Sequence, residues 1–400
     1  MTLDVLSNNI DFSPLHDRMQ WYVDQEILPF CSTLVMRGLD VLDYKCFGYV
    51  DVDRKHRLRS DAIYRMFSNS KIVTSVAAMI LYDEGRLGLD DPLSDYIPDF
   101  SQPQVLIKGA TRIDQTEPLQ TDITIRHLLS HSAGFSYGFI EPESLIDQAY
   151  LSDGLNMLRK YPGTLKTLMT HLSKFPLVYQ PGSDWRYSIA TDVVSRVIEI
   201  VSGQSLDVFF SERIFQPLNM KDTGFFIPSS EKDRLAALYI PEDMMNPMIP
   251  GFQLYKNQED SQTHQAPICL SGGGGLYSTV ADYVNFMRLF INNGTWNNAK
   301  ILRPGTVDLM RRNHLADGIR MNFPMWDMKD SVFGLGFALK YSSALHEDKN
   351  LQEYHWGGMA GTHSWMSPQG VSGLCMTQLM PGFWHPFSHD FKEISYKITT

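Results

Sequence analysis

The order of the expected elements constrains the fold most, because strand-like segments lie near both ends of the chain with helical segments between them. Residues 32–51 predict two strands around a turn at Gly38-Leu39-Asp40. Further strands are expected near the other end, at residues 333–341, 362–367 and 372–379. Helices are expected at residues 13–28, 71–84, 124–131, 191–201, 206–215, 279–293 and 387–397. This order favours an α/β (α+β) class with the sheet built from both ends of the chain.

The chain has 400 residues, of which 43% are apolar, and this is enough for a sizeable core. No internal repeat and no linker rich in Pro, Gly and Ser is evident. We expect a single domain over residues 1–400. Its α/β subdomain should comprise about 1–100 and 271–400, and a mostly helical subdomain about 101–270.

The charge balance is acidic, since 35 Lys and Arg face 45 Asp and Glu for a net charge of −10. No run of Lys or Arg is longer than two residues. Contacts to phosphates need clustered basic side chains, so no nucleic-acid partner is expected.

Cysteine content and hydropathy predict the compartment. Four cysteines without a CxxC pair (Cys31, Cys46, Cys269 and Cys375) favour buried free thiols and a reducing environment. The first residues, Met1 to Phe12, form no apolar leader, and the longest apolar run, Val76 to Leu81, is too short to span a bilayer. We therefore expect a cytoplasmic protein without a membrane partner. The oligomeric state is not predicted.

Ser68 and Lys71 form an S-x-x-K pattern at the start of the apolar segment 71–84, which ends at Gly85. Residues three apart share one face of a helix. A lysine that is buried loses its proton more easily, and it can then activate a neighbouring hydroxyl as a nucleophile. This pair is the leading candidate for catalysis.

Two other serine motifs compete with it. Ser229 and Lys232 form a second S-x-x-K, but in a polar stretch that predicts a surface helix start. Ser136 is the centre of a formal G-x-S-x-G, yet a helix is expected before it, whereas a nucleophile elbow needs a strand there. Neither serine is expected to be catalytic.

No metal or organic cofactor is expected. His127 and His131 are four residues apart, but the glutamate of an H-E-x-x-H zinc motif is missing, and packing with helix capping by His131 explains them better. The glycines at 272–275 lack the Lys-Ser/Thr of a phosphate-binding loop, which favours close backbone packing near the site. The Met-rich stretch 238–268 is expected to be a lid or a wall of the pocket.

Two later motifs give Ser68 and Lys71 a context. Tyr187-Ser188-Ile189 follows them, and His355-Trp356-Gly357-Gly358 comes near the end of the chain. In this order the motifs resemble the S-x-x-K, Y-x-N and K-T-G motifs of the serine β-lactamase/penicillin-binding superfamily. The flanking phrases are similar as well: EGRLGLDDPLSDYIPDF (84–100), ITIRHLLSHSAGF (123–135), SGQSLDVFFSERIFQPLNMKDTGF (202–225) and SGGGGLYSTVADYVNFM (271–287).

Two departures from these motifs narrow the resemblance. Ile189 stands in place of the asparagine, and a W-G-G sequence replaces the K-T-G lysine motif. Both changes are similar to the class C-like esterases called family VIII carboxylesterases and to related fungal acyltransferases. The resemblance implies a β-lactamase/transpeptidase-like fold, in which an antiparallel sheet is flanked by helices and joined to a mostly helical subdomain.

The resemblance also implies roles. Ser68 attacks an ester carbonyl, and Lys71 and Tyr187 share the proton transfer. The backbone N–H groups of Ser68 and Met359 hold the oxyanion if Trp356 occupies the lysine's position.

If His355 occupies that position instead, the second oxyanion donor is Gly358. In either case His355, Trp356 and Gly357 complete the expected substrate-binding set. The expected substrate is a small, neutral ester of short to medium chain length, and water or an alcohol releases the acyl group.

Two alternatives remain open. One is a β-lactamase or D-Ala-D-Ala carboxypeptidase-type enzyme, with a protonated His355 in place of the lysine. The other is a non-catalytic binding protein on the same fold.

Overall fold

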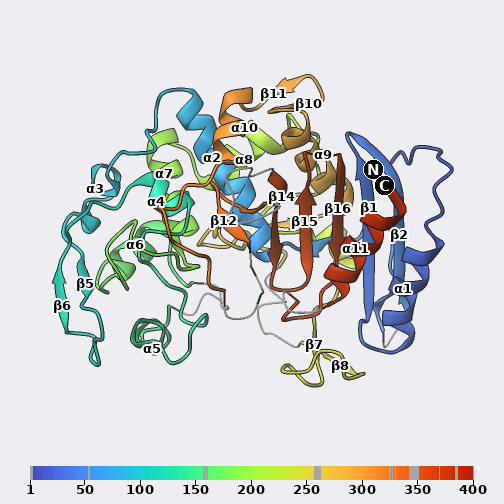
Figure 1. Cartoon of the computed structure of the whole chain (residues 1–400), viewed down its shortest axis with the longest axis horizontal. Coiled ribbons are helices and arrows are strands. Elements are labelled where there is room, and N and C mark those ends of the chain that lie inside the picture. Colours follow the sequence, from blue (N-terminus) through green and yellow to red (C-terminus); the bar gives the residue numbers. More distant parts are fainter. Residues whose placement is uncertain are drawn as a thin grey trace.

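The structure, a computed structural model, describes residues 3–52, 55–155, 161–255, 263–323, 326, 328, 330–341, 351–368, 370–382 and 386–399. Its largest sheet has eight strands in the order β12-β13-β14-β15-β16-β1-β2-β3 (Figure 1), and every pair in it is antiparallel. Its strands are β1 (Phe30–Arg37), β2 (Asp40–Asp51), β3 (His56–Arg57), β12 (Ser331–Phe333), β13 (Ala338–Tyr341), β14 (Leu351–Gly358), β15 (Thr362–Met366) and β16 (Val371–Met376). Because β1 pairs with β16, the two ends of the chain share one sheet, as predicted.

The strand predictions are confirmed with two corrections. The first hairpin turns at Gly38, whose φ of +56° favours glycine. The predicted strand 333–341 is two strands, because the chain turns between Phe333 and Ala338. Strand β14 was not predicted, although it carries the third motif. Its glycines and mixed polarity give no strand pattern.

Helices cover both faces of the sheet. Helices α1 (Ser13–Asp24) and α11 (Phe387–Thr399) pack together on one face, and α9 (Val280–Ile291) contacts β15 and β16 on the other (Figure 1). Helix α2 (Ser70–Asp83) is buried over most of its length and packs on α7 (Ala190–Ser202). All five match predicted helices to within a few residues, although α1 ends four residues early.

The remaining elements lie mostly in the middle of the chain. The helices are α3 (Leu93–Tyr96), α4 (Ile125–Leu129), α5 (Leu145–Ser152), α6 (Leu165–Leu172), α8 (Leu206–Phe210) and α10 (Pro304–Met310), with 3₁₀ turns η1 (Phe67–Asn69), η2 (Pro98–Phe100) and η4 (Ser229–Arg234) and the π-helical η3 (Ser211–Phe215). The short strand pairs are β4 (Tyr64–Arg65) with β9 (Tyr277–Ser278), β5 (Gln104–Leu106) with β6 (Thr116–Pro118), β7 (Tyr239–Pro241) with β8 (Phe252–Leu254), and β10 (Thr295–Trp296) with β11 (Ala299–Lys300). The subdomain boundaries near 101 and 270 stay predictions.

The histidine helix needs a correction. Thr124 caps α4 as predicted, and its backbone N–H donates to the ring of His127, which completes a capping box. The helix ends at Leu129, and His131 lies beyond it with a φ of +57°. His127 therefore does the capping that was predicted for His131.

All four cysteines are free thiols, and three are buried while Cys46 is half-buried. Among the described residues, no helix combines the length and apolar character needed to cross a bilayer. In the same ranges, no three His, Cys, Asp or Glu side chains converge as a metal site would need.

Candidate functional site

Ser68 lies in η1, the single 3₁₀ turn that leads into α2. The preceding residue, Phe67, has a φ of +45°, a left-handed conformation that is rare for an aromatic residue and common at functional sites. Asn69 ties this turn to β15, donating to the Thr362 carbonyl at 3.1 Å and accepting from Ser364 at 3.2 Å. The sharp turn is thus fixed to the sheet while Ser68 stays partly exposed.

Lys71 is 1% exposed, and its ammonium makes three hydrogen bonds. Nζ lies 3.3 Å from Ser68 Oγ, 2.8 Å from the Tyr137 hydroxyl and 2.6 Å from the Gly273 carbonyl oxygen. Burial lowers the pKa of Lys71 to about 7, and the negative charge of Asp192 opposes this shift. A large fraction of Lys71 is therefore neutral near pH 7 and able to accept a proton.

Tyr187 completes the group that the sequence predicted. Its hydroxyl accepts from Trp356 Nε1 at 3.2 Å, and both Trp356 and Ser68 lower the pKa of the phenol. Lys71 Nζ lies 4.8 Å from the centre of its ring. Burial raises the pKa of Tyr187, so its phenol keeps its proton more firmly than Lys71 does. The structure thus brings Ser68, Lys71 and Tyr187 together.

Tyr137 is a member of the site that the sequence analysis missed. Its hydroxyl contacts Lys71, and its ring lies 5.4 Å from that of Tyr187. Tyr137 belongs to the formal G-x-S-x-G pattern, in which only the serine was considered as a catalytic residue. Its position two residues after the 123–135 phrase was the available signal.

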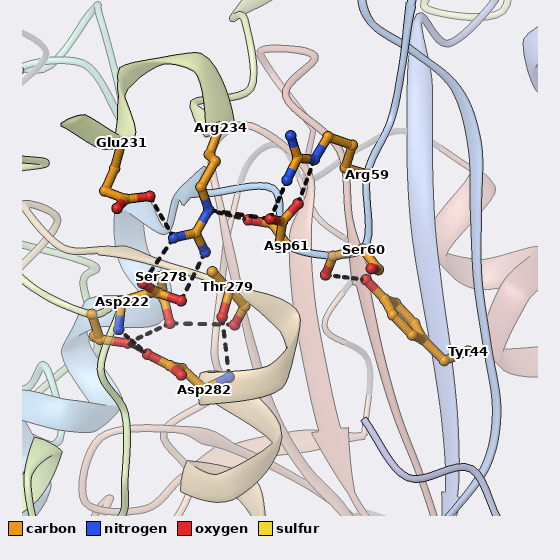
Figure 2. A network of polar contacts seen from close by, with 11 residues as sticks. Tyr44, Arg59, Ser60, Asp61, Asp222, Glu231, Arg234, Ser278, Thr279 and Asp282 are labelled. Atoms are coloured by element: carbon orange, nitrogen blue, oxygen red, sulfur yellow. Dashed lines mark hydrogen bonds and ion pairs between the residues drawn. The ribbon is translucent and has the colours of Figure 1, made fainter. Parts of the chain in front are cut away.

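The glycine run before α9 packs against the site, as predicted. Gly273 offers its carbonyl to Lys71, and the N–H of Leu276 donates to Ser70 Oγ at 3.2 Å. A polar network secures the segment that follows it (Figure 2). Ser278 contacts Thr223, and the carboxylate of Asp282 accepts from Thr223 and from the N–H of Asp222, which pairs with Arg234.

Strand β14 and its turn supply the other predicted positions. Trp356 is buried against the rings of Tyr187, Phe323 and Phe333, with its indole N–H pointing at the phenol. Gly358 lies close to the turn that carries Ser68, since a Cβ there would lie 2.3 Å from the Met66 carbonyl oxygen.

Backbone donors are also available at this point. Within the described ranges, no backbone acceptor pairs with the N–H of Ser68 or of Met359. Two free N–H groups of this kind are what an oxyanion requires. The Met359 carbonyl accepts from the N–H of Gly382, which anchors this residue.

His355 lies on the other face of the sheet, because side chains alternate along β14. Its ring is 5.6 Å from that of His363, and its cross-strand neighbour Trp365 packs edge-to-face on Phe391 of α11. Burial lowers the pKa of His355 well below its usual range, and nearby lysines add to this. It is neutral and turned away from Ser68, contrary to its predicted place in the substrate-binding set.

The other serine motifs lie in different surroundings. Ser136 is fully buried, where it donates to the Asp147 carboxylate and accepts from Arg186 Nε at 2.7 Å. Ser229 and Lys232 lie exposed in η4. Among the described contacts, no hydrogen bond joins either serine to a lysine amine, and the carboxylate that contacts Ser136 is itself paired with Arg186.

The Met-rich stretch carries the hairpin β7–β8, and its residues 256–262 lie outside the described part. Its described contacts include Glu26, Phe30, Val52, Ile227 and residues 378–380. Met245 is 89% exposed. Nothing in these contacts joins the stretch to Trp356, so its role as a pocket wall stays a prediction.

The chain was compared with known proteins. The family described as Beta-lactamase matches residues 20–382. Protein Rv1367c of Mycobacterium tuberculosis is 31% identical over 361 residues, which cover 87% of this chain and 82% of the relative. Esterase EstB of Burkholderia gladioli is 28% identical over 393 residues, which cover 94% of this chain and 93% of the relative. The solved structure of EstCE1, a hydrolase with promiscuous acyltransferase activity, gives a TM-score of 0.80 at 25% identity and covers 96% of this chain and 97% of that chain.

Proposed function

Because the chain belongs to the beta-lactamase family, we propose that it is a serine hydrolase that cleaves carboxylic esters through an acyl-enzyme on Ser68. One observation carries the proposal: Ser68 Oγ lies between a buried amine with a lowered pKa and a phenol. An amine with a pKa of about 7 matches the pH at which a general base works best. The esterase name of EstB supports the same chemistry.

In the first step Ser68 Oγ bonds to the ester carbonyl carbon, and its proton passes to the Lys71–Tyr187 pair. The N–H groups of Ser68 and Met359 stabilise the charge on the carbonyl oxygen. As the C–O bond breaks, the leaving alcohol takes a proton from the same pair. Lys71, with the lower pKa, holds the base role at neutral pH, and Tyr187 relays the proton.

In the second step water attacks the acyl-enzyme and returns the serine. EstCE1 is described as having promiscuous acyltransferase activity, so we include an alcohol as a second acceptor for the acyl group. No step uses a metal or an organic cofactor.

The preference for esters over β-lactams rests on two side chains. Ile189 is buried and has no polar group for the amide of a β-lactam side chain. Trp356 carries no charge for the carboxylate, and its N–H is already bonded to Tyr187. Leaving two polar groups of the drug unpaired costs about 1–3 kcal/mol each. We infer a neutral ester of short to medium chain length as substrate, and a cytoplasmic location from the free thiols.

Steady-state hydrolysis of p-nitrophenyl butyrate and nitrocefin tests this function. We expect kcat/KM for the ester to exceed that for nitrocefin at least tenfold, since one unpaired polar group alone accounts for roughly that factor. A phosphonate that labels serine nucleophiles should modify Ser68, as located by peptide mass spectrometry. Equal or faster turnover of nitrocefin would instead establish a β-lactamase, and His355→Ala would show whether an imidazole takes part. No labelling and no turnover would leave a binding protein.

A further inference from the structure

Asp192 is a fully buried carboxylate in the first turn of α7, and the mechanism above does not use it. Its Oδ1 accepts from Ser271 Oγ at 2.7 Å and from the Gly273 N–H at 3.2 Å. Its Oδ2 has no hydrogen-bond partner within the described part of the chain. A buried carboxylate oxygen without a partner is costly, so its retention needs an explanation.

Gly273 links this carboxylate to the candidate base. The N–H of Gly273 donates to Asp192, while its carbonyl accepts from Lys71 Nζ at 2.6 Å. A side chain on Gly273 would not fit, because its Cβ would lie 2.4 Å from Asp192 Oδ2 and 3.1 Å from the Tyr137 hydroxyl. Asp192 thus anchors the residue whose carbonyl holds Lys71, and its second oxygen faces the same small space.

The titratable groups around this space show which one of them Asp192 attracts. Lys71 faces His131, Tyr137 and Tyr187, and burial keeps all three neutral by lowering the pKa of the histidine and raising those of the phenols.

On the far side of Asp192, burial raises the pKa of Cys269 to about 12, so that this thiol is also neutral. The charge that acts on the buried ammonium is therefore that of Asp192. Burial also raises the pKa of Asp192, and the ammonium of Lys71 opposes that shift, so each group stabilises the charge of the other.

We infer that Asp192 is a positioning residue for the reaction: it orients Lys71 through Gly273 and supplies the counter-charge of its ammonium. The inference rests on the proposed function only for the role of Asp192 in ester hydrolysis; the attraction between Asp192 and Lys71 does not depend on it. The carboxylate opposes the loss of the lysine proton. It keeps Lys71 a stronger base than burial alone would allow, so that Lys71 can accept the serine proton and return it to the leaving alcohol.

The first test is the variant Asp192→Asn, which keeps an acceptor for Ser271 and Gly273 but removes the charge. An opposite charge at this range changes a pKa by about 1–3 units, so the acid limb of kcat/KM for p-nitrophenyl butyrate should move to lower pH by about one unit or more. On the alkaline plateau kcat should fall while KM changes little, because the base is weaker. Ser271→Ala is the matched control: it removes one hydrogen bond to Asp192 without removing a charge, so its acid limb should stay in place. An acid limb of Asp192→Asn that coincides with wild type would overturn the inference.

The second test needs no activity and holds even if Asp192→Asn folds poorly. Lys71→Met and Asp192→Asn each leave one buried charge alone, whereas the double variant leaves none. The double variant should melt at a higher temperature than the sum of the two single changes predicts. Additive melting shifts would mean that the charges do not act on each other. A failed ester assay with a positive melting result would reject the proposed function and keep the Asp192–Lys71 pair.

Discussion

The same spacing of serine and lysine occurs at Ser68–Lys71 and at Ser229–Lys232, and the two sites differ in almost everything else. Lys71 is 1% exposed at the start of an apolar helix, and its pKa falls to about 7. Lys232 is exposed in a short 3₁₀ helix that has no buried residue. We infer from the comparison that burial of the amine, rather than the spacing, makes Ser68 and Lys71 the candidate nucleophile and base.

The partners of the two lysines differ as well. Around Lys71 the chain collects Tyr137, Tyr187 and the Gly273 carbonyl from segments far apart in the sequence. These contacts hold the amine beside the serine at one side of a packed core. A four-residue pattern does not encode them, so substitutions at the two sites should have very different effects.

The largest difference is expected for the serines. Ser68→Ala should lower the hydrolysis of p-nitrophenyl butyrate at least about a thousandfold, which corresponds to roughly 4 kcal/mol, because it removes the covalent route. Ser229→Ala, the matched control from the exposed pair, should keep wild-type kcat/KM. Activity that survives in Ser68→Ala and disappears in Ser229→Ala would reverse the comparison.

The second largest loss of activity is expected when either of the two proposed proton-transfer residues is replaced. Lys71→Ala and Tyr187→Phe should each lower kcat by about 10²- to 10⁴-fold, since both serve one transfer. The double variant should be little worse than the poorer single variant. Kinetics of the four proteins at one pH measure this.

Lys232→Ala should leave kcat unchanged and serves as the control for the loss of a lysine. Losses that multiply in the Lys71→Ala, Tyr187→Phe double variant would mean that the two groups act independently.

The sequence predicts the helices and strands of this molecule to a different extent than it predicts the residues of the site. Periodic elements such as α2 and α7, and the sheet built from both chain ends, follow from apolar spacing and from Gly85 and Gly203 at helix ends. Strand β14 was not predicted from the sequence, because pairing with β13 and β15 overrides its weak local pattern.

Within the site, motif order predicted Ser68, Lys71 and Tyr187, which the structure brings together. Tyr137 and Asp192 were missed because their roles depend on tertiary contacts with Lys71 and Gly273. The error at His355 has a simpler cause. Neighbouring residues of a strand point to opposite faces, and only the register of β14 shows which of His355 and Trp356 faces the serine.

The acid limb of the pH profile should report the burial of Lys71. Only neutral Lys71 accepts the serine proton, so kcat/KM for a neutral ester should fall tenfold per pH unit below about 7 and level off above it. The same lowered pKa makes stability rise with pH between about 7 and 10.5, where the unfolded chain binds the proton and the folded chain does not.

Profiles of kcat/KM from pH 5 to 9 and urea unfolding across pH 7 to 10.5 measure these two effects. The Lys232→Ala variant should reproduce the wild-type limb. A limb centred near about pH 4 would indicate a carboxylate instead.

The smallest effect on catalysis is expected at Ser136, which extends the comparison to a serine that is buried but has the wrong partners. Its hydroxyl bridges Asp147 and Arg186, which also pair directly at 3.1 Å. Ser136→Ala should lower the free energy of unfolding by about 1–3 kcal/mol, because it removes a hydrogen bond from each buried charge. Activity of the folded protein should stay within a few-fold of wild type. Urea unfolding and esterase assays well below the melting temperature separate the two effects. If Ser136→Ala instead kept full stability and lost activity as Ser68→Ala does, burial with a proton-accepting lysine would no longer distinguish the nucleophile, and the comparison that supports Ser68 would fail.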